Sequence, residues 1–240
     1  MSLHRYWFGL IILLLLISAC LPGLEVLSPS QGHNDPSELR YLALGDSYTV
    51  GEGIGMKKSL PYQLVDALLK EDYSFGEPSV IARTGWTTDE LLRAIEENPP
   101  QGSFELVTLL IGVNNQFRGY SPEAYRSEFK ELLNLSIQYA GNNPACVIVL
   151  SIPDWGGTPF ARLAGFERGQ IALQIDRFNR INREESDLAG VGYVDITAIS
   201  RRAADEPSLI AGDGLHPSPM MIQEWVEQAL PEVKACLINP

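Results

Sequence analysis

The chain is poor in the residues that mark several common protein classes. Its 240 residues include three cysteines and three histidines, and 18 basic residues stand against 30 acidic ones, for a formal net charge of −12. Nucleic-acid-binding proteins normally present a basic face, so this charge argues against that class. The basic residues form no dense run, which also disfavours electrostatic binding to an anionic membrane. The cysteines lack the paired spacing of a zinc site, and we expect neither metal nor cofactor.

The chain also lacks an apolar run long enough for a membrane-spanning helix. The run from Tyr6 to Ile17 falls short of the roughly 20 residues that such a helix needs. With Arg5 before it and small residues after it, this run is typical of a secretory signal. The sequence Ile17-Ser18-Ala19-Cys20 resembles the bacterial lipobox, which implies that Cys20 becomes a lipidated N-terminus. The alternative is an ordinary signal peptide with a chance cysteine.

We therefore divide the chain into a signal at 1–20, a linker at 21–36 and one domain at 37–240. The 16 linker residues are rich in Pro, Gly, Ser and Asn, and fully extended they reach at most about 50 Å. The resulting prediction is an exported protein, anchored by lipid on the periplasmic or cell-surface side of a bacterial membrane. If Cys20 is not acylated, the leader has no tethering role.

Two cysteines remain in the predicted domain. An exported chain occupies a compartment where disulfides persist, so Cys146 and Cys236 are able to form a bridge there. Cys146 opens an apolar strand and Cys236 lies near the C-terminus, and nothing in the sequence brings them together. The expectation is therefore two buried or unpaired thiols.

From Leu39 onward, short apolar runs alternate with amphipathic stretches. Two of the runs are nearly continuous hydrophobes, as expected for parallel strands covered on both faces. The expected strands are Tyr41–Leu44, Ser79–Ala82, Leu106–Ile111, Cys146–Ser151 and Tyr193–Ile196. The expected helices are Pro61–Lys70, Thr88–Glu97, Ser121–Ala140, Glu167–Leu188 and Ser218–Lys234. Strict alternation predicts a three-layer α/β/α sandwich with a five-stranded parallel sheet, for which we adopt the flavodoxin-like order 2-1-3-4-5.

Two motifs follow neighbouring strands of this predicted sheet. Ser47, in Gly45-Asp46-Ser47, comes just after the first strand, and Asn114 comes just after the third. Ligands of such sheets bind outside the carboxyl ends of the strands, where the strand order reverses. Both motifs therefore belong to one crevice.

A serine hydroxyl needs a base to become a nucleophile, and histidine suits that task near neutral pH. His4 falls in the predicted signal and His33 in the linker, which leaves His216 as the candidate base for Ser47. Asp213, three residues earlier, is close enough to take the other imidazole N–H, as in Ser-His-Asp triads. The alternative for Asp213 is a capped turn.

Acyl transfer also needs donors aimed at the developing oxyanion. The candidates are the backbone N–H groups of Ser47 and Gly85 and the side-chain amide of Asn114. Gly85 lacks a Cβ, so its backbone can approach a ligand closely. Taken singly, Gly85 and Asn114 also fit ordinary turn positions.

Together these blocks resemble the GDSL esterases and lipases of the SGNH hydrolase superfamily. The resemblance implies that Ser47 is the nucleophile, Asp213 and His216 complete the triad, and Ser47, Gly85 and Asn114 form the oxyanion hole. It spans about Tyr41 to Leu230, in the order and spacing of that superfamily. One departure is Asn115, where the family usually has aspartate. This aspartate is not a triad member, so the change bears on local packing more than on activity.

The substrate is less defined by the sequence. Five aromatic residues follow the predicted strands: Trp86, Phe117, Tyr120, Trp155 and Phe160. We expect Trp86, Phe117 and Trp155 to line a substrate pocket that holds an acyl chain or stacks on a sugar, although each ring also fits a role in covering the sheet edge. The predicted function is a serine esterase for small acyl esters of glycans or for lipid esters. The rival is a ligand-binding lipoprotein that has lost catalysis.

Overall fold

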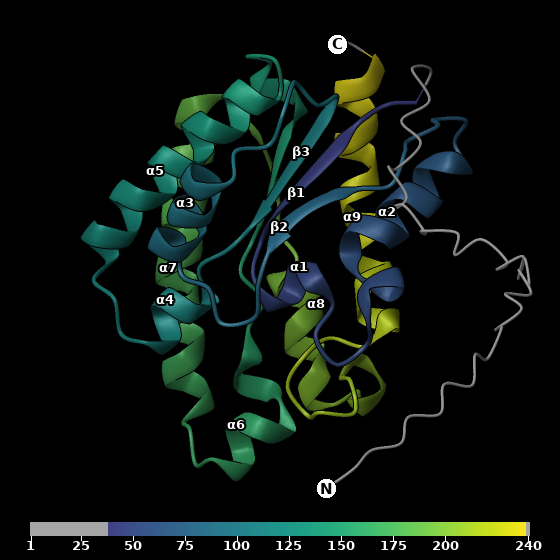
Figure 1. Cartoon of the computed structure of the whole chain (residues 1–240). Coiled ribbons are helices and arrows are strands. Elements are labelled where there is room, and N and C mark those ends of the chain that lie inside the picture. Colours follow the sequence, from purple (N-terminus) through teal and green to yellow (C-terminus); the bar gives the residue numbers. More distant parts are fainter. Residues whose placement is uncertain (1–37, 239–240) are drawn as a thin grey trace, which may run out of the picture. The chain divides into compact units, whose positions relative to one another are not determined.

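A five-stranded parallel sheet forms the centre of the computed structural model, which describes residues 38–238 (Figure 1). The strands are β1 (Tyr41–Gly45), β2 (Ser79–Ala82), β3 (Leu106–Leu110), β4 (Val147–Leu150) and β5 (Gly192–Val194). Their order is β2-β1-β3-β4-β5 and every neighbouring pair is parallel. The predicted fold class and strand order are confirmed.

The three central strands are buried along their whole length. Every residue of β1, β3 and β4 is buried, which explains their nearly continuous hydrophobic sequence. At one edge, β2 is only partly covered. At the other edge β5 ends at Val194, earlier than predicted, because Asp195 begins the next turn by accepting the Thr197 N–H through Oδ1 at 2.9 Å.

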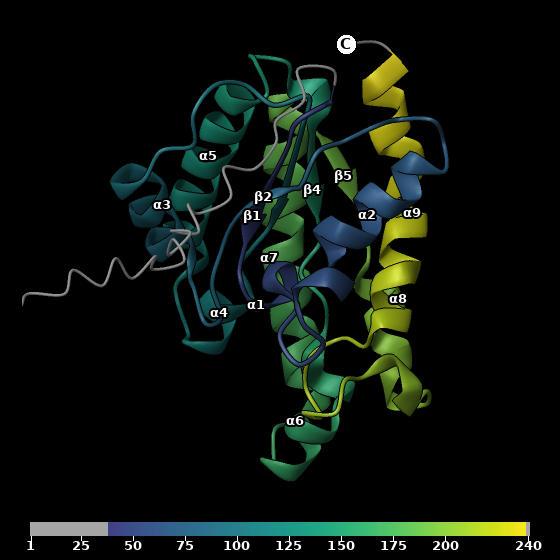
Figure 2. The same ribbon diagram turned by 45° about the vertical axis from the view of Figure 1, so that its right-hand side comes forward.

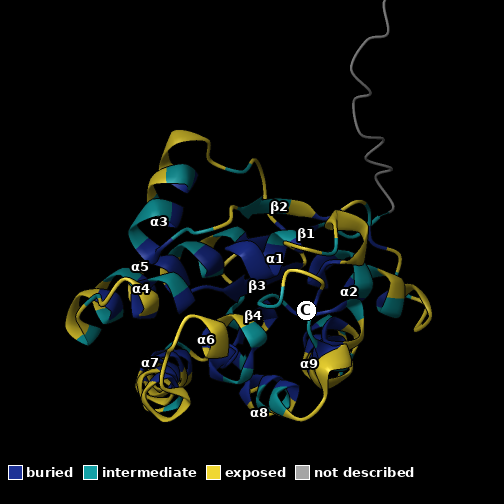
Figure 3. Ribbon diagram, turned by 90° about the horizontal axis from the view of Figure 1, so that it is seen from below, coloured by how far each residue is buried: buried dark blue, intermediate teal, exposed yellow. Residues whose placement is uncertain are grey.

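Helices cover both faces of the sheet, with α3, α5 and α7 on one face and α2 and α9 on the other (Figures 1 and 3). The α-helices are α1 (Ser47–Val50), α2 (Leu60–Leu69), α3 (Thr88–Glu97), α4 (Val113–Phe117), α5 (Pro122–Tyr139), α6 (Pro159–Leu163), α7 (Arg168–Ala189), α8 (Thr197–Arg201) and α9 (Pro219–Ile238). Short 3₁₀ turns lie at Met56–Lys58, Pro144–Cys146, Trp155–Gly157, Arg202–Ala204 and Pro207–Leu209. The five predicted helices correspond to α2, α3, α5, α7 and α9.

The N-terminus of α3 shows how local sequence starts a helix beside the later site. Thr87 and Glu90 form a capping box, in which each side chain accepts the backbone N–H of the other residue. The N–H of Thr87 reaches Glu90 Oε2 at 3.0 Å. This box fixes the direction in which the chain leaves β2 and enters α3.

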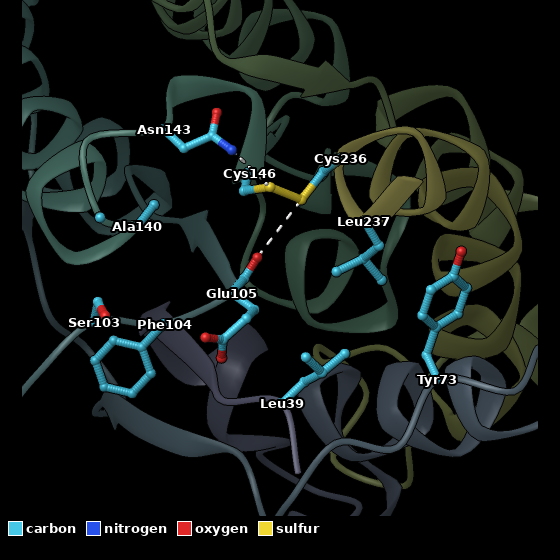
Figure 4. Close-up of a pocket in the computed structure, with 11 residues that line it drawn as sticks. Leu39, Tyr73, Ser103, Phe104, Glu105, Ala140, Asn143, Cys146, Cys236 and Leu237 are labelled. Carbon is cyan, nitrogen blue, oxygen red and sulfur yellow. Dashed lines mark hydrogen bonds between the residues drawn. A yellow bond between two sulfur atoms is a disulfide. The ribbon is translucent and has the colours of Figure 1, made fainter. Parts of the chain in front are cut away.

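Cys146 and Cys236 form a disulfide, so the expectation of two unpaired thiols is wrong. Cys146 immediately precedes β4 and Cys236 lies in the last turns of α9, with their Cα atoms 5.0 Å apart (Figure 4). The pairing depends on how α9 returns across the sheet, so that its C-terminal end meets the amino end of β4. The two cysteines are 90 residues apart, and the sequence alone does not indicate that packing direction.

In the part of the chain that the structure describes, no helix is both long enough and apolar enough to cross a membrane. The predicted signal with Cys20 and the linker at 21–36 lie outside the described residues.

Candidate active site

A cavity of about 220 Å³ opens at the carboxyl ends of the strands, beside α1, α4 and α6. It is lined by Ser47, Tyr48, Thr84, Gly85, Val113, Asn114, Phe117, Trp155, Phe160, Leu215 and His216. Four of the five polar site residues predicted from sequence therefore meet at one cavity. The fifth, Asp213, is bonded directly to His216.

Ser47 is the first residue of α1 and follows β1 after a sharp turn. The turn needs glycine at position 45, since a Cβ there would lie 2.4 Å from the backbone oxygen of Leu110 on the neighbouring strand. Asp46 caps α1 by accepting the Tyr48 N–H at 3.0 Å. This geometry presents Ser47 at the end of the sheet with 5% of its surface exposed.

Asp46, the residue before the serine, is also buried. Its Oδ1 accepts the Tyr48 N–H, whereas its Oδ2 has no hydrogen-bond partner among the described residues. Burial raises the pKa of Asp46 to about 7, and the Tyr48 hydrogen bond only partly offsets this. Near neutral pH this carboxyl therefore exists in both protonation states.

Asp213 orients the His216 imidazole. His216 Nδ1 lies 2.7 Å from Asp213 Oδ2, and Asp213 Oδ1 accepts the backbone N–H groups of Leu215 and His216 at 2.9 and 3.0 Å. Partial burial raises the pKa of Asp213, but these hydrogen bonds outweigh it and hold that pKa below its ordinary value. An ionised Asp213 favours the tautomer protonated at Nδ1, which leaves Nε2 as the basic nitrogen.

Ser47 Oγ and His216 line the same cavity, and no hydrogen bond joins them in the described part of the chain. Such a bond is often long until substrate binds. The Tyr48 ring packs edge-on against the His216 ring, with 5.8 Å between their centroids, and so limits rotation of the imidazole.

The candidate oxyanion donors come from three separate segments. Gly85 has φ +88°, a left-handed conformation that favours glycine. Asn114, in α4, donates one Nδ2 hydrogen to the carbonyl of Trp86 at 2.9 Å. This bond fixes the plane of the amide and leaves its second N–H for a ligand.

Asn115, the departure from the family pattern, is fully buried and well bonded. Its Oδ1 accepts the Thr88 N–H at 3.1 Å and its Nδ2 donates to Thr88 Oγ1 at 2.7 Å. The Thr88 hydroxyl in turn donates to Glu128. An aspartate would draw the Thr88 hydroxyl proton to itself, so asparagine frees that proton for Glu128. The packing at this position is therefore intact.

Aromatic side chains form one wall of the cavity. Phe117, Trp155 and Phe160 line it, whereas Trp86 and Tyr120 do not. Trp86 is half-buried against the core and contributes its carbonyl to Asn114 instead. Trp155 is buried, and its indole N–H donates to Gln116 at 2.9 Å.

The sequence analysis did not identify Phe166 and Arg118. The Phe166 ring centroid lies 5.0 Å from that of Trp155, 6.0 Å from that of Phe117 and 6.4 Å from that of Phe160. We call Phe117, Trp155, Phe160 and Phe166 the aromatic wall. Arg118 donates to the carbonyl of Gly85 at 2.6 Å. The sequence held no signal for Arg118, because α4 is too short to be predicted from its own pattern.

Within residues 38–238, no three His, Cys, Asp or Glu side chains gather in a way that would hold a metal ion. The cavity and the residue bonded to His216 bring together a hydroxyl, an imidazole, a carboxylate and hydrogen-bond donors. These are the components of nucleophilic acyl transfer.

Comparison with known proteins gives a consistent result. The model of the GDSL-like lipase/acylhydrolase family matches residues 43–221. An arylesterase from Vibrio mimicus is 25% identical over 191 residues, which cover 79% of this chain and 84% of the relative.

Solved structures share the fold at lower sequence identity. The esterase EstA from Pseudoalteromonas sp. is 18% identical with a TM-score of 0.60, and the match covers 84% of this chain and all of that chain. The acetylxylan esterase Axe2 from Geobacillus stearothermophilus is also 18% identical with a TM-score of 0.60, over 81% of this chain and 94% of that one.

Proposed function

The chain belongs to the GDSL-like lipase/acylhydrolase family and is a serine ester hydrolase, and from this premise we propose that Ser47, His216 and Asp213 cleave neutral esters with a short acyl group. The observation that supports these roles is the meeting of Ser47 and His216 at one cavity, with the imidazole held by Asp213 at 2.7 Å. The rival assignment as a ligand-binding protein without catalysis is not favoured.

The reaction begins when Ser47 Oγ attacks the ester carbonyl and His216 Nε2 takes the hydroxyl proton. Asp213 stabilises the imidazolium that forms. The negative oxygen of the tetrahedral intermediate is held by the N–H groups of Ser47 and Gly85 and by the amide of Asn114.

Collapse of the intermediate breaks the bond to the alcohol, which leaves with the proton from His216. Water then attacks the acyl-Ser47 ester, with His216 again acting as base. The acid is released and Ser47 recovers its proton, so that one ester and one water give one acid and one alcohol.

The cavity supports a preference for small, apolar esters. Its volume of about 220 Å³ lies below the range of roughly 300–1,000 Å³ that drug-sized ligands occupy. One side is the aromatic wall, on which an aryl or other apolar group packs favourably. The net charge of −12 disfavours anionic substrates. The arylesterase relative is consistent with this substrate class.

Release of p-nitrophenol from its acetyl, butyryl and octanoyl esters tests the proposal. We expect activity in the wild type that falls by at least ~10³-fold in Ser47→Ala. Ser136→Ala is a matched control, because Ser136 is also buried but its hydroxyl donates to the Leu132 carbonyl within α5. Equal activity in wild type and Ser47→Ala would refute the assignment of the nucleophile.

We also propose that the enzyme is exported and lipid-anchored through Cys20. The supporting observations are the short apolar run and the lipobox-like tetrapeptide before the predicted linker. Metabolic labelling of the full chain with a fatty-acid analogue should mark the wild type and leave Cys20→Ala unmarked. Equal labelling of both would refute the anchor, whereas the esterase assignment would be unaffected.

A further inference from the structure

The segment that carries Gly85 has few interactions of its own. We call residues 84–87, between β2 and α3, the oxyanion strap. It follows the partly exposed edge strand β2, and the Trp86 N–H closes a turn by donating at 3.2 Å to the carbonyl of Arg83, the residue before the strap. A donor on such a segment must be held by other parts of the molecule, because catalytic geometry tolerates errors of only about 0.5 Å.

Three side chains hold three consecutive residues of the strap. Arg118 Nη2 donates to the Gly85 carbonyl at 2.6 Å, and Asn114 Nδ2 donates to the Trp86 carbonyl at 2.9 Å. Glu90 Oε2 accepts the N–H of Thr87 at 3.0 Å.

Arg118 also connects these contacts to one another. Its Nη1 lies 3.1 Å from Glu90 Oε1, so one guanidinium joins the strap carbonyl to the carboxylate that caps α3. The hydrogen bond to Glu90 raises the pKa of Arg118 above its ordinary value. Partial burial raises the pKa of Glu90, but its hydrogen bonds from Thr87 and Arg118 outweigh it and leave that pKa low. Both partners are therefore charged across the neutral range.

Asn114 and Arg118 belong to the same short helix, one turn apart. Asn114 is in α4 and Arg118 is its C-cap, whose N–H donates to the Asn114 carbonyl at 2.9 Å. Arg118 therefore binds the Gly85 carbonyl, and Asn114 binds the neighbouring carbonyl of Trp86. These two bonds connect the segment that carries the Gly85 N–H to the helix that carries the Asn114 amide. A shift of the strap would move one donor relative to the other.

We propose that Arg118 is a positioning residue of the oxyanion hole, holding the Gly85 N–H in register with the Asn114 amide. The inference rests on the proposed function, in which Gly85 and Asn114 stabilise the oxyanion. Arginine suits this position because its planar fork reaches the Gly85 carbonyl and Glu90 at the same time, which the single ammonium of lysine does less well.

The expected signature is a loss of kcat with little change in KM. Oxyanion stabilisation is realised in the transition state, so misplacing a donor slows the chemistry without weakening ground-state binding. Loss of one whole donor costs ~10²–10³-fold in kcat, and misplacement of Gly85 should cost part of this, about 10–100-fold.

The experiment compares Arg118→Met, Arg118→Lys and Arg93→Met in the full chain with p-nitrophenyl butyrate. Arg93 is a matched control, since it lies in α3 and pairs with Asp89 at 3.4 Å without touching the strap. We expect Arg118→Met to lose at least 10-fold in kcat with KM within about threefold, Arg118→Lys to recover part of the loss, and Arg93→Met to match wild type.

Three results would overturn the proposal. The first is a kcat of Arg118→Met within twofold of wild type, and the second is an equal loss of kcat in Arg93→Met. The third is a loss of kcat that Arg118→Lys does not recover and that parallels a lower melting temperature of the variants. Failure of the proposed function is distinguishable, because the wild type would then show no activity above Ser47→Ala on any of the esters.

Discussion

The two ends of the central sheet each carry a cavity, and the larger one is not the candidate active site. At the amino end a cavity of about 500 Å³ is lined mainly by apolar side chains, the backbone around Glu105 and the disulfide (Figure 4). At the carboxyl end the cavity is less than half that size, yet it gathers Ser47, Gly85, Asn114 and His216. Convergence of polar groups at strand ends, rather than volume, marks the site.

The two ends also differ in how they are held together. At the amino end one covalent bond joins Cys146 to Cys236, and Asn143 Nδ2 points to the Cys146 sulfur at 3.4 Å (Figure 4). At the carboxyl end hydrogen bonds hold loops and short helices, and α6 projects beyond the sheet (Figure 2). Changes at one end should therefore affect catalysis, and changes at the other should affect stability.

Among the variants that test this difference between the two ends, Asp213→Asn should have the largest effect on kcat. The asparagine would keep an acceptor for the N–H groups of Leu215 and His216, but would place an amide N–H against His216 Nδ1. This reverses the tautomer and leaves no free basic nitrogen toward Ser47. We expect kcat to fall by ~10³–10⁴-fold with the fold retained, measured by steady-state kinetics and thermal melting.

Asp195→Asn is the control for Asp213→Asn, because Asp195 also accepts a backbone N–H two residues ahead, from Thr197, but does not line the cavity that holds His216. A kcat for Asp213→Asn within tenfold of wild type would contradict the role of Asp213.

Cys146→Ala with Cys236→Ala should give the opposite result. The bond closes a loop of 90 residues, and chain-entropy arguments give a loss of about 2–5 kcal/mol in the free energy of unfolding when such a bridge is removed. The kcat should stay near that of wild type, because the bridge is at the opposite end of the sheet from Ser47.

Urea denaturation of this double variant, and of wild type with and without reductant, measures the effect. If kcat falls by more than the fraction of unfolded protein under the assay conditions explains, the two ends are coupled.

Different kinds of information made these two ends predictable to different degrees. The five strands and the five longer helices follow from continuous apolar runs and amphipathic stretches, which report local burial. Ser47 and Asn114 were identified because their motifs follow strands, and His216 because the other two histidines fall in the predicted signal and linker. The short helices α1, α4, α6 and α8 were not predicted, since helices of four or five residues are fixed by tertiary contacts rather than by propensity.

The disulfide and the Arg118 contact were beyond reach for the same reason. Cys146 meets Cys236 only because α9 crosses the sheet in one direction, and Arg118 meets Gly85 only because α4 lies beside the strap. Both are contacts between segments well separated in sequence.

Asp46→Asn tests stability at the catalytic end and should have an intermediate effect. The folded protein binds a proton at Asp46 with a pKa of about 7, whereas the unfolded chain does so near 4. The folded state therefore binds more protons between these values, so its stability falls as pH rises from about 4 to 7. Between pH 5 and pH 8 this contribution amounts to about 2–3 kcal/mol.

Asparagine keeps the acceptor for the Tyr48 N–H and removes the titration. Urea midpoints at pH 5 and pH 8 should differ less for Asp46→Asn than for wild type, with the variant the more stable at pH 8. An unchanged pH dependence would mean that Asp46 ionises in the fold as it does in water.

The smallest expected effect concerns substrate size at the aromatic wall. Phe166 is 42% exposed and Leu163, on α6, is 84% exposed, so the apolar surface continues outward from the cavity. An octanoyl chain is long enough to leave the small cavity and cover part of this surface, at up to ~0.8 kcal/mol per buried CH₂. In Leu163→Ser with Phe166→Ser, we expect the octanoyl-to-acetyl ratio of kcat/KM to fall about 3–10-fold while acetyl ester hydrolysis is maintained.

Leu188→Ser is the matched control, since Leu188 is 81% exposed near the end of α7 and does not line the cavity. An equal fall in the control, or none in the double variant, would confine the substrate to the cavity itself.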